Sequence, residues 1–321
     1  MARGLKQVLK VGDRQVSVSS LDKILYPEAG FTKGQVIDYY IRISKYLLPH
    51  LKGRPVTLKR YPNGVQGKHF YEKDAPAFTP EWVRTFPVPR RAGGTDIRYI
   101  IIDDLPTLVW AVNLANLEIH PFLHRVPRLE RPTSVVFDLD PGEGADILSC
   151  ARVAFALRDL LGGMKLEAFP KVSGSKGMQI YVPLNTAVSY EKTLPFARAV
   201  AAYVEKREPD LVVSEMAKIV RTNKVFIDWS QNSDFKTTVS VYSLRAKRAA
   251  PFVSIPVTWD ELGEALHKGD LRRLDFPPAA ALERAERLGD LFAPLLKLKQ
   301  KLPSWGGQRG PDLPASPAFV K

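Results

Sequence analysis

Two aspartates separated by one residue, Asp138 and Asp140, follow the apolar run Ser134–Phe137 and precede a Pro-Gly turn. The pattern predicts a strand that ends at an open edge. Because alternate side chains of a strand share a face, both carboxylates should project together while Leu139 points into the core. Neighbouring carboxylates repel unless a cation lies between them, and oxygen-only ligands favour Mg²⁺ or Mn²⁺ over zinc. A solvated strand end that leads into a turn fits the same residues.

A third aspartate, Asp228, also ends an apolar run, Val225–Ile227. Three aspartates on strands can hold two metal ions about 4 Å apart, an arrangement that stabilises the attacking and leaving oxygens in phosphoryl or nucleotidyl transfer. Arg221, Lys224 and Arg245 lie near Asp228 in the sequence and would neutralise the charge of a triphosphate, although some of them must be ordinary surface charges.

The loop of residues 172–177 is rich in glycine and serine and lies between two predicted strands. It is therefore not a P-loop, which requires a helix to follow. Its glycines permit a close approach of the backbone, and Ser173, Ser175 and Lys176 offer donors to phosphate oxygens. A hairpin loop with a solvated lysine is the alternative interpretation.

Two adjacent aromatic residues, Phe70 and Tyr71, lie among basic residues and could stack on nucleic-acid bases. Aromatic pairs also occur in cores, so the pattern alone leaves both interpretations open. His120 is either a site residue or a hydrogen-bonded core histidine.

The composition indicates a polyanionic partner. The chain has 47 Lys and Arg against 34 Asp and Glu, a net charge of +13 and a pI of about 9.7, which favour nucleic acid over a protein with merely basic solvated faces. With 321 residues and 45% hydrophobic content, it can form one large domain or two subdomains. The single cysteine, Cys150, excludes an intrachain disulfide and is expected in the core. No signal peptide or membrane span is apparent, so a cytoplasmic location is expected.

The elements that must position these residues alternate between strands and helices. Apolar periodicity predicts a helix over 36–47 that Pro49 ends, and helices from Asp146 and over 196–205. Strands are expected at 55–60, 98–102, 134–140, 179–184, 224–229 and 237–242. Thr258–Glu261 has the pattern of a capping box. The alternation predicts an α/β (α+β) fold with a mixed sheet flanked by helices. The Pro, Gly and Ser content of residues 301–321 predicts a flexible tail.

Together these segments resemble the polymerase domain of bacterial DNA ligase D, a member of the archaeo-eukaryotic primase superfamily that acts in non-homologous end joining. The resemblance extends from about Asp22 to Leu262. The motifs that carry it are Leu21–Pro27, Gly53–Val56, Glu118–Pro121, Asp138–Gly142, Ser173–Gly177, Val225–Asp228 and Tyr242–Arg245. It implies a single catalytic domain over 1–300, with a DNA-end-binding portion over about 1–130 and a metal and nucleotide portion over about 131–300.

The resemblance also implies roles for individual residues. Asp138, Asp140 and Asp228 would hold two metal ions, with Mn²⁺ favoured over Mg²⁺. The nucleotide-binding residues would be Lys59, His120, Ser173, Lys176, Gln179, Arg221 and Arg245. Lys23 and Lys33 would bind the 5′-phosphate of a recessed end, and Phe70 and Tyr71 would stack on template bases. A preference for ribonucleotides is implied by the resemblance alone, as are Ku and an ATP-dependent DNA ligase as partners of a monomer associated with the nucleoid.

Two residues depart from the family pattern. Asp74 stands where a histidine commonly follows the family's lysine, here Lys73, and the second departure, at Gln179, matters more. Gln179 stands where the family usually has histidine, and its amide can donate a hydrogen bond but can be neither a cation nor a proton donor at neutral pH. Triphosphate affinity or its pH dependence should therefore differ from the family's.

Three functions are compatible with these residues. The first is a template-dependent nucleotidyltransferase that extends primers and fills gaps in DNA with 5′-phosphorylated ends, using NTP or dNTP. The second is an end-binding or bridging module whose polymerase site has decayed, which only Gln179 favours. The third is a metal-dependent nuclease, for which Ser173, Lys176 and Arg245 would have no role.

Overall fold

The computed structural model describes residues 6–303, and the chain divides into two compact units. Unit 1 comprises residues 1–128, 237–255 and 275–290, and unit 2 comprises 129–236, 256–274 and 291–321. The first division, between Arg128 and Leu129, lies near the sequence boundary expected at about 130. Unit 1 nevertheless contains two segments from the second half of the chain. Most of the expected tail, from residue 304, lies outside the described residues.

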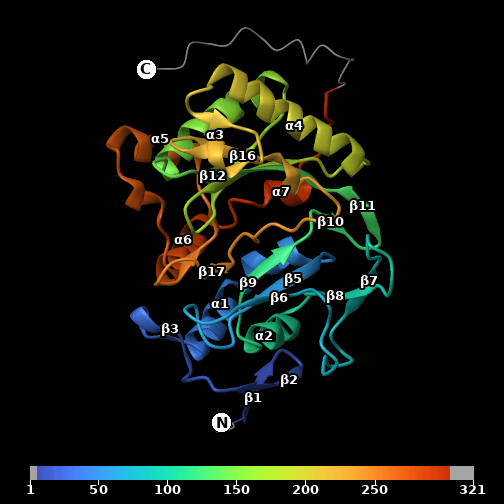
Figure 1. The fold of residues 1–321 in the computed structure, drawn as a ribbon. Helices are drawn as coiled ribbons and strands as arrows, with labels where there is room; N and C mark the ends of the chain where they lie inside the picture. Colours follow the sequence, from blue (N-terminus) through green and yellow to red (C-terminus); the bar gives the residue numbers. More distant parts are fainter. Residues whose placement is uncertain (1–5, 304–321) are drawn as a thin grey trace. The chain divides into compact units, whose positions relative to one another are not determined.

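Unit 1 is built around a five-stranded sheet in which β5 (Pro55–Arg60) pairs with β9 on one side and with β6 and β8 on the other. The remaining strands are β6 (Phe70–Glu72), β7 (Thr85–Val88), β8 (Ile97–Ile101) and β9 (Asn116–Pro121). Helices α1 (Lys33–Leu51) and α2 (Leu105–Asn113) pack against each other beside this sheet (Figure 1). The strands expected near 55–60 and 98–102 are confirmed.

Helix α1 begins at a capping box in which the Thr32 side chain accepts from Gln35 N and the Gln35 side chain accepts from Thr32 N. Its buried face includes Tyr40 and Ile43, as the apolar periodicity predicted. The prediction that Pro49 ends the helix is wrong, because the helix continues to Leu51. Only two residues of the helix follow Pro49, and burial of Leu51 in the core favours this extension.

The rest of unit 1 consists of short elements. They are the hairpins β1 (Lys6–Val11) with β2 (Arg14–Ser19), β3 (Ile24–Tyr26) with β4 (Phe31–Thr32) and β17 (Leu244–Arg245) with β18 (Phe252–Val253), η1 (Pro27–Ala29), β10 (His124–Arg125) and α6 (Pro278–Leu288). The strand expected at 237–242 is wrong. Thr238 N and Ser240 N donate to carbonyls of Pro121 and Ile119, but Tyr242 adopts a left-handed φ of 64°, which a regular strand does not accommodate.

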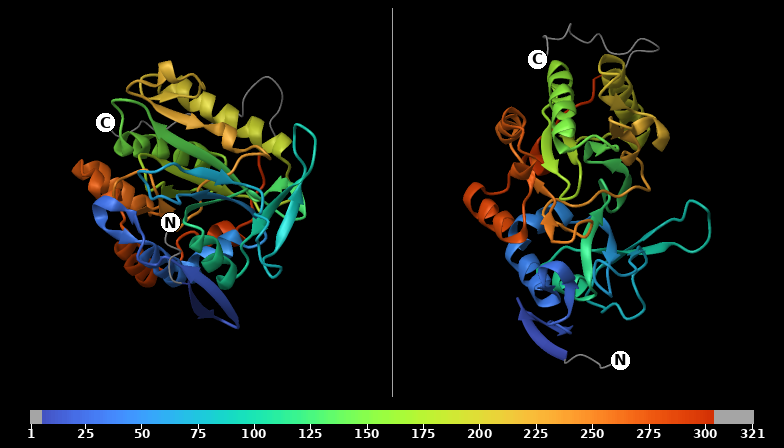
Figure 2. Two further views of the ribbon diagram at one scale, coloured as in Figure 1. Left: turned by 60° about the horizontal axis from the view of Figure 1, so that its bottom comes forward. Right: turned by 60° about the vertical axis from the view of Figure 1, so that its left-hand side comes forward.

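Unit 2 contains a mixed six-stranded sheet with the order β15-β16-β12-β14-β13-β19. Its strands are β12 (Ser134–Pro141), β13 (Phe169–Val172), β14 (Met178–Pro183), β15 (Val212–Val213), β16 (Val225–Asp228) and β19 (Ile255–Pro256), and β11 (Arg128–Pro132) precedes β12. β12 is antiparallel to both neighbours, whereas β15 and β16 are parallel. Helices α3 (Ile147–Gly163) and α4 (Tyr190–Arg207) lie side by side against this sheet (Figure 2).

Two helices of unit 2 begin where the sequence indicated, whereas α4, expected over 196–205, already begins at Tyr190. Asp146 caps α3, with Cys150 buried in its first turns, and Thr258 caps α5 (Trp259–Lys268) in a complete capping box. The other helical elements are η2 (Lys218–Arg221), η3 (Trp229–Gln231), η4 (Leu271–Leu274) and α7 (Pro294–Lys297). The expected α+β fold is thus confirmed. No helix in the described part of the chain has the length and apolar character to span a membrane.

Candidate functional site

The sheet of unit 2 brings four polar residues into one row. Asp138 on β12 lies opposite Gln179 on β14 and opposite Asp228 on β16, and Gln179 in turn lies opposite Lys171 on β13. Residues paired directly across strands share a face of the sheet, so the row runs Lys171, Gln179, Asp138, Asp228. Asp140 lies two positions beyond Asp138 on the same face.

The charges in this row interact. Burial, followed by the charges of Asp140 and Asp228, raises the pKa of Asp138 to about 7, against a hydrogen bond from Gln179 and the charge of Lys171, which lower it. The three carboxylates are therefore close enough to repel one another, and a bound cation would relieve that repulsion. Lys171 has no exposed surface, so its charge acts on this row from within the sheet. The sequence patterns had given this residue no role.

The donor set fits a hard divalent cation, since carboxylate oxygens dominate it. Among the residues described, however, no three acidic, histidine or cysteine side chains are already gathered around one point. Asp228 supplies a physical reason. Its Oδ1 accepts from Ser230 N at 2.9 Å and Ser230 Oγ at 2.6 Å, and its Oδ2 accepts from Gln231 Nε2 at 2.7 Å. Asp228 would have to exchange some of these hydrogen bonds for a metal ion.

Two glycines allow the backbone to approach β12 closely. A Cβ atom on Gly177 would collide with the carbonyl oxygen of Leu139, and a Cβ atom on Gly142 would collide with the carbonyl oxygen of Arg221. Gly177 therefore allows the glycine-rich loop to lie against the strand that carries Asp138 and Asp140, and Gly142 allows the backbone of Arg221 to lie against the turn after that strand.

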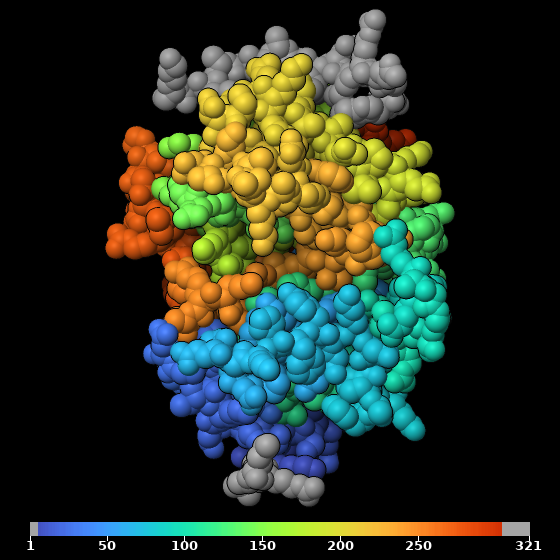
Figure 3. All heavy atoms as spheres, viewed as in Figure 1, coloured from blue at the N-terminus to red at the C-terminus, as the bar shows by residue number. Residues whose placement is uncertain are grey.

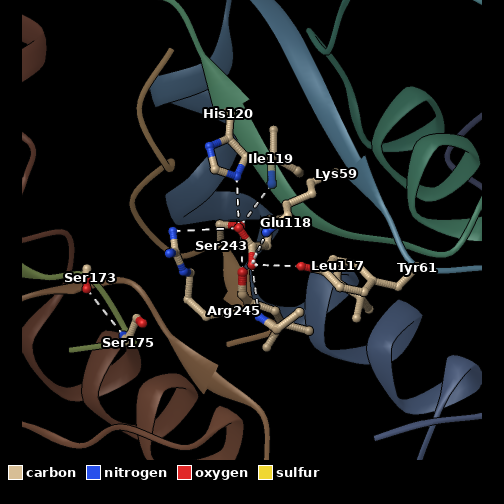
Figure 4. Close-up of polar contacts among 12 residues, drawn as sticks. Lys59, Tyr61, Leu117, Glu118, Ile119, His120, Ser173, Ser175, Ser243 and Arg245 are labelled. Carbon is tan, nitrogen blue, oxygen red and sulfur yellow. Dashed lines mark hydrogen bonds and ion pairs between the residues drawn. The ribbon is translucent and has the colours of Figure 1, made fainter. Parts of the chain in front are cut away.

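The glycine-rich loop connects β13 to β14, as expected. Ser173 Oγ accepts from Ser175 N at 3.3 Å (Figure 4). The Lys176 side chain is exposed. Arg221 folds over the ring of Phe226 at 3.6 Å and donates to the carbonyl of Met216. Within unit 2, Lys176 is thus free to reach a ligand from an exposed position, whereas Arg221 is held against its own segment.

A second polar cluster lies in unit 1 around Glu118, which is completely buried on β9 (Figure 4). Glu118 lies opposite Lys59 of β5, and His120 lies opposite Thr57. The groups that point at its carboxylate are His120 Nε2 at 2.9 Å, Ala246 N at 3.0 Å, Tyr61 OH at 3.5 Å, Lys59 Nζ at 3.6 Å and Arg245 Nη1 at 3.7 Å. Three predicted nucleotide-binding residues, Lys59, His120 and Arg245, therefore meet at one carboxylate.

The environment keeps this carboxylate charged. Burial alone would raise the pKa of Glu118, but the hydrogen bond from His120 and the charges of Arg245, His120 and Lys59 hold that pKa well below its usual range. Burial lowers the pKa of His120, Glu118 opposes this, and Arg245 and Lys59 add to the lowering. At neutral pH the cluster therefore contains a carboxylate and a neutral imidazole.

Aromatic residues border this cluster. Lys59 Nζ lies 5.3 Å from the ring centroids of both Tyr61 and Tyr71, and the Tyr71 ring meets that of His120 edge-on at 6.0 Å. Phe70 and Tyr71 are 43% and 54% exposed, so they do not belong to a core. The segment around β6 and β7 lies at the surface, in light blue to cyan, on the face shown in Figure 3. Rings at such positions are available for stacking.

The two lysines assigned to a 5′-phosphate lie close together in unit 1. Lys33 N donates to the carbonyl of Lys23, and the charges of Lys23 and Arg60 act on Lys33. Lys23 is exposed, but Lys33 is only 5% exposed and its Nζ donates to the carbonyl of Ser19 at 2.6 Å. A phosphate would therefore meet Lys23 first.

The sequence patterns did not single out Glu118 and Lys171 as members of these clusters. Both are charged residues inside apolar strands, and that is the signal which marks them: a charge that folding buries needs a partner. The partners themselves depend on strand register.

An α+β fold with strand-borne aspartates and a cationic cluster is compatible with the resemblance to the polymerase domain of DNA ligase D. Comparison with known proteins identifies the family. The model of the family "LigD, primase-polymerase domain" matches residues 32–292. The chain belongs to this family.

Two curated relatives and one solved structure support the same family assignment. The multifunctional non-homologous end joining protein LigD of Mycolicibacterium smegmatis is 41% identical over 283 residues, which cover 88% of this chain and 36% of that protein. The bifunctional LigD of Bacillus subtilis is 35% identical over 254 residues, or 78% of this chain and 40% of that protein. The solved polymerase domain of Mycobacterium tuberculosis ligase D in complex with DNA has a TM-score of 0.82 at 40% identity, covering 90% of this chain and 100% of that one. This chain thus spans about two-fifths or less of these curated relatives.

Proposed function

We propose that this chain is a template-dependent nucleotidyltransferase that extends primers and fills gaps at DNA double-strand breaks in non-homologous end joining. The observation that carries the proposal is the pairing of Asp138 with Asp228 across β12 and β16, beside Asp140, in a chain of the LigD polymerase family. The complex of the Mycobacterium tuberculosis domain with DNA supports DNA as the substrate.

In the proposed reaction a primer 3′-hydroxyl attacks the α-phosphate of a nucleotide in line with the leaving pyrophosphate. Asp138, Asp140 and Asp228 would hold two divalent ions, Mn²⁺ or Mg²⁺, which when bound stabilise the attacking and leaving oxygens. Asp228 would release at least one of its hydrogen bonds to Ser230 or Gln231 in order to do so.

Other residues of the chain bind and orient the substrates in this proposal. Ser173, Lys176, Arg221 and Arg245 donate to the phosphates of the nucleotide, with Lys59 adding charge from within the sheet. Gln179 has less access to a ligand than sequence analysis assumed, since it is 2% exposed and hydrogen-bonds to Asp138. Lys23 and Lys33 bind a 5′-phosphate, and Phe70 and Tyr71 stack on bases. We also propose a preference for ribonucleotides, a monomeric state, a location at the nucleoid, and Ku and an ATP-dependent ligase as partners.

The proposal is tested by offering a 5′-phosphorylated gapped duplex with Mn²⁺ and either ribonucleotides or deoxyribonucleotides. We expect template-dependent addition that is faster with ribonucleotides. Binding of the gapped DNA without any addition would support the end-bridging alternative instead. Shortening of the strands would support the nuclease.

A further inference from the structure

The groups that surround the carboxylate of Glu118 can only donate, apart from the Tyr61 hydroxyl and the His120 ring nitrogen, which can donate or accept. Oε1 faces Ala246 N, Tyr61 OH and Lys59 Nζ, and Oε2 faces His120 Nε2 and Arg245 Nη1. A backbone N–H, an ammonium and a guanidinium have no acceptor to offer, so a proton on Glu118 would have no suitable partner among them. Glu118 therefore acts as an ionised acceptor, in agreement with its lowered pKa.

An ionised carboxylate fixes the tautomer of His120. Since Glu118 can only accept, Nε2 of His120 must carry the proton in their 2.9 Å hydrogen bond. The pKa of His120 is lowered, so its other ring nitrogen, Nδ1, has a lone pair at neutral pH. Nδ1 lies on the side of the ring away from the Glu118 contact (Figure 4). No hydrogen bond to Nδ1 exists among the described residues, and the side chain is 12% exposed.

A neutral acceptor restricts what His120 can bind. The lone pair of Nδ1 repels a phosphate oxygen, which at neutral pH also offers only lone pairs. A nucleotide offers two kinds of donor, the hydroxyls of its sugar and the N–H groups of its base. A template-directed enzyme must accept every base, and the base N–H groups on the pairing edge are needed by the template. The sugar hydroxyls are the donors that all ribonucleotides share.

We infer that Glu118 is a positioning residue that holds His120 as a hydrogen-bond acceptor for the 2′-hydroxyl of the incoming nucleotide. The inference rests on the proposed function and names a residue pair behind its ribonucleotide preference. A deoxyribonucleotide lacks this donor and leaves Nδ1 without a partner. Glu118 itself touches no substrate in this arrangement and acts through His120.

We predict that the substitution Glu118→Gln changes the tautomer of His120. Three donors converge on Oε1, so the amide oxygen should occupy that position, and the amide NH₂ should then face His120 in place of Oε2. An NH₂ group donates, so Nε2 must accept and the proton must move to Nδ1. His120 would then lose its acceptor for the 2′-hydroxyl.

Nitrogen-15 NMR of the imidazoles tests the first step without requiring polymerase activity. The His120 signals are assigned by their absence from His120→Ala protein. We expect the Nε2–H tautomer in the unaltered protein and the Nδ1–H tautomer in Glu118→Gln. A proton on Nδ1, or a charged ring at pH 7, in the unaltered protein would overturn the inference. That measurement decides the point even if Glu118→Gln does not fold.

Nucleotide selectivity tests the second step. The ratio of the affinities for ATP and dATP, measured by calorimetry, should fall roughly threefold to tenfold in His120→Ala and in Glu118→Gln, the range expected for one neutral hydrogen bond. His267→Ala, at an exposed position of α5, should keep the original ratio. An unchanged ratio of ATP to dATP affinity in His120→Ala would contradict the assignment. A change that appears only in the ratio of ATP to 3′-deoxyadenosine triphosphate affinity would also contradict it, because it would assign His120 to the 3′-hydroxyl. If the unaltered protein extends no DNA, the proposed function fails, while the tautomer and the affinity ratio still decide this inference.

Discussion

Lys33 occupies the first position of α1, where burial, followed by the charges of Lys23 and Arg60, lowers its pKa to about 8. The group is a base, so it is charged below pH 8 and neutral above it. A phosphate monoester is already dianionic throughout that range, because its second pKa is about 6. If Lys33 helps to bind a 5′-phosphate, the preference for phosphorylated gaps should weaken as the pH rises from 7 to 9.

The ratio of dissociation constants for unphosphorylated and 5′-phosphorylated gaps measures this preference. Lys33→Met removes the charge at every pH, so its ratio should be low and independent of pH. Lys23→Ala should lower the ratio at all pH values and keep its dependence on pH. A ratio for the unaltered protein that stays constant from pH 7 to 9 would exclude Lys33 from the phosphate site.

Two hydrogen bonds hold the side chain of Gln179 in the row of polar residues that contains Asp138. Its amide donates to Asp138, and its Oε1 accepts from Tyr181 OH at 3.4 Å. Removing a hydrogen bond to a charged group costs about 1.5–3 kcal/mol, so Gln179→Ala should weaken Mn²⁺ binding by roughly tenfold or more. Titration of Mn²⁺ by electron paramagnetic resonance measures this directly. Unchanged Mn²⁺ affinity together with a raised KM for the nucleotide would instead assign Gln179 to the triphosphate.

At the scale of elements, the sequence predicted the strand that carries Asp138 and the starts of two helices, but it did not predict which residues pair across the strands. The alternation in Asp138-Leu139-Asp140 indicated correctly a strand with Leu139 in the core. The capping residues Asp146 and Thr258 marked two helix starts. The partners of Asp138 depend on which residues β14 and β16 place opposite it. A slip of one residue would turn those side chains to the other face, and nothing in a single sequence fixes that choice.

The contact between the glycine-rich loop and β12 gives a prediction at this scale. Gly177→Ala adds a Cβ atom that must displace the backbone at Leu139, next to both aspartates. Such overpacking typically costs 1–3 kcal/mol, so the melting temperature and the rate of extension should both fall. Gly263→Ala in α5 is the matched control. Its Cβ would lie 3.8 Å from the Phe155 ring, and alanine favours helix, so the melting temperature should stay or rise. Equal melting temperatures for the two variants would contradict the close approach.

At the scale of the whole molecule, the division into units was the least predictable feature. Residues 237–255 and 275–290 return to unit 1 after the chain has built most of unit 2. Arg245 thereby reaches Glu118, which lies 127 positions earlier in the sequence. Composition gives no information on such returns, which depend on long-range packing. The charge of +13, by contrast, follows directly from the composition, and if the chain binds DNA as proposed, its affinity should fall steeply with added salt.

The strand-borne carboxylates of unit 2 are proposed to carry out nucleotidyl transfer, and their substitution tests this role. Single-turnover extension of a 5′-phosphorylated gapped duplex with Mn²⁺ is compared for the unaltered protein, Asp138→Ala and Asp228→Ala. We predict that each substitution lowers the rate at least about a hundredfold, or nearly 3 kcal/mol in barrier. DNA affinity should persist, because lysines, arginines and exposed rings supply it. Near-normal extension by both variants would contradict the account.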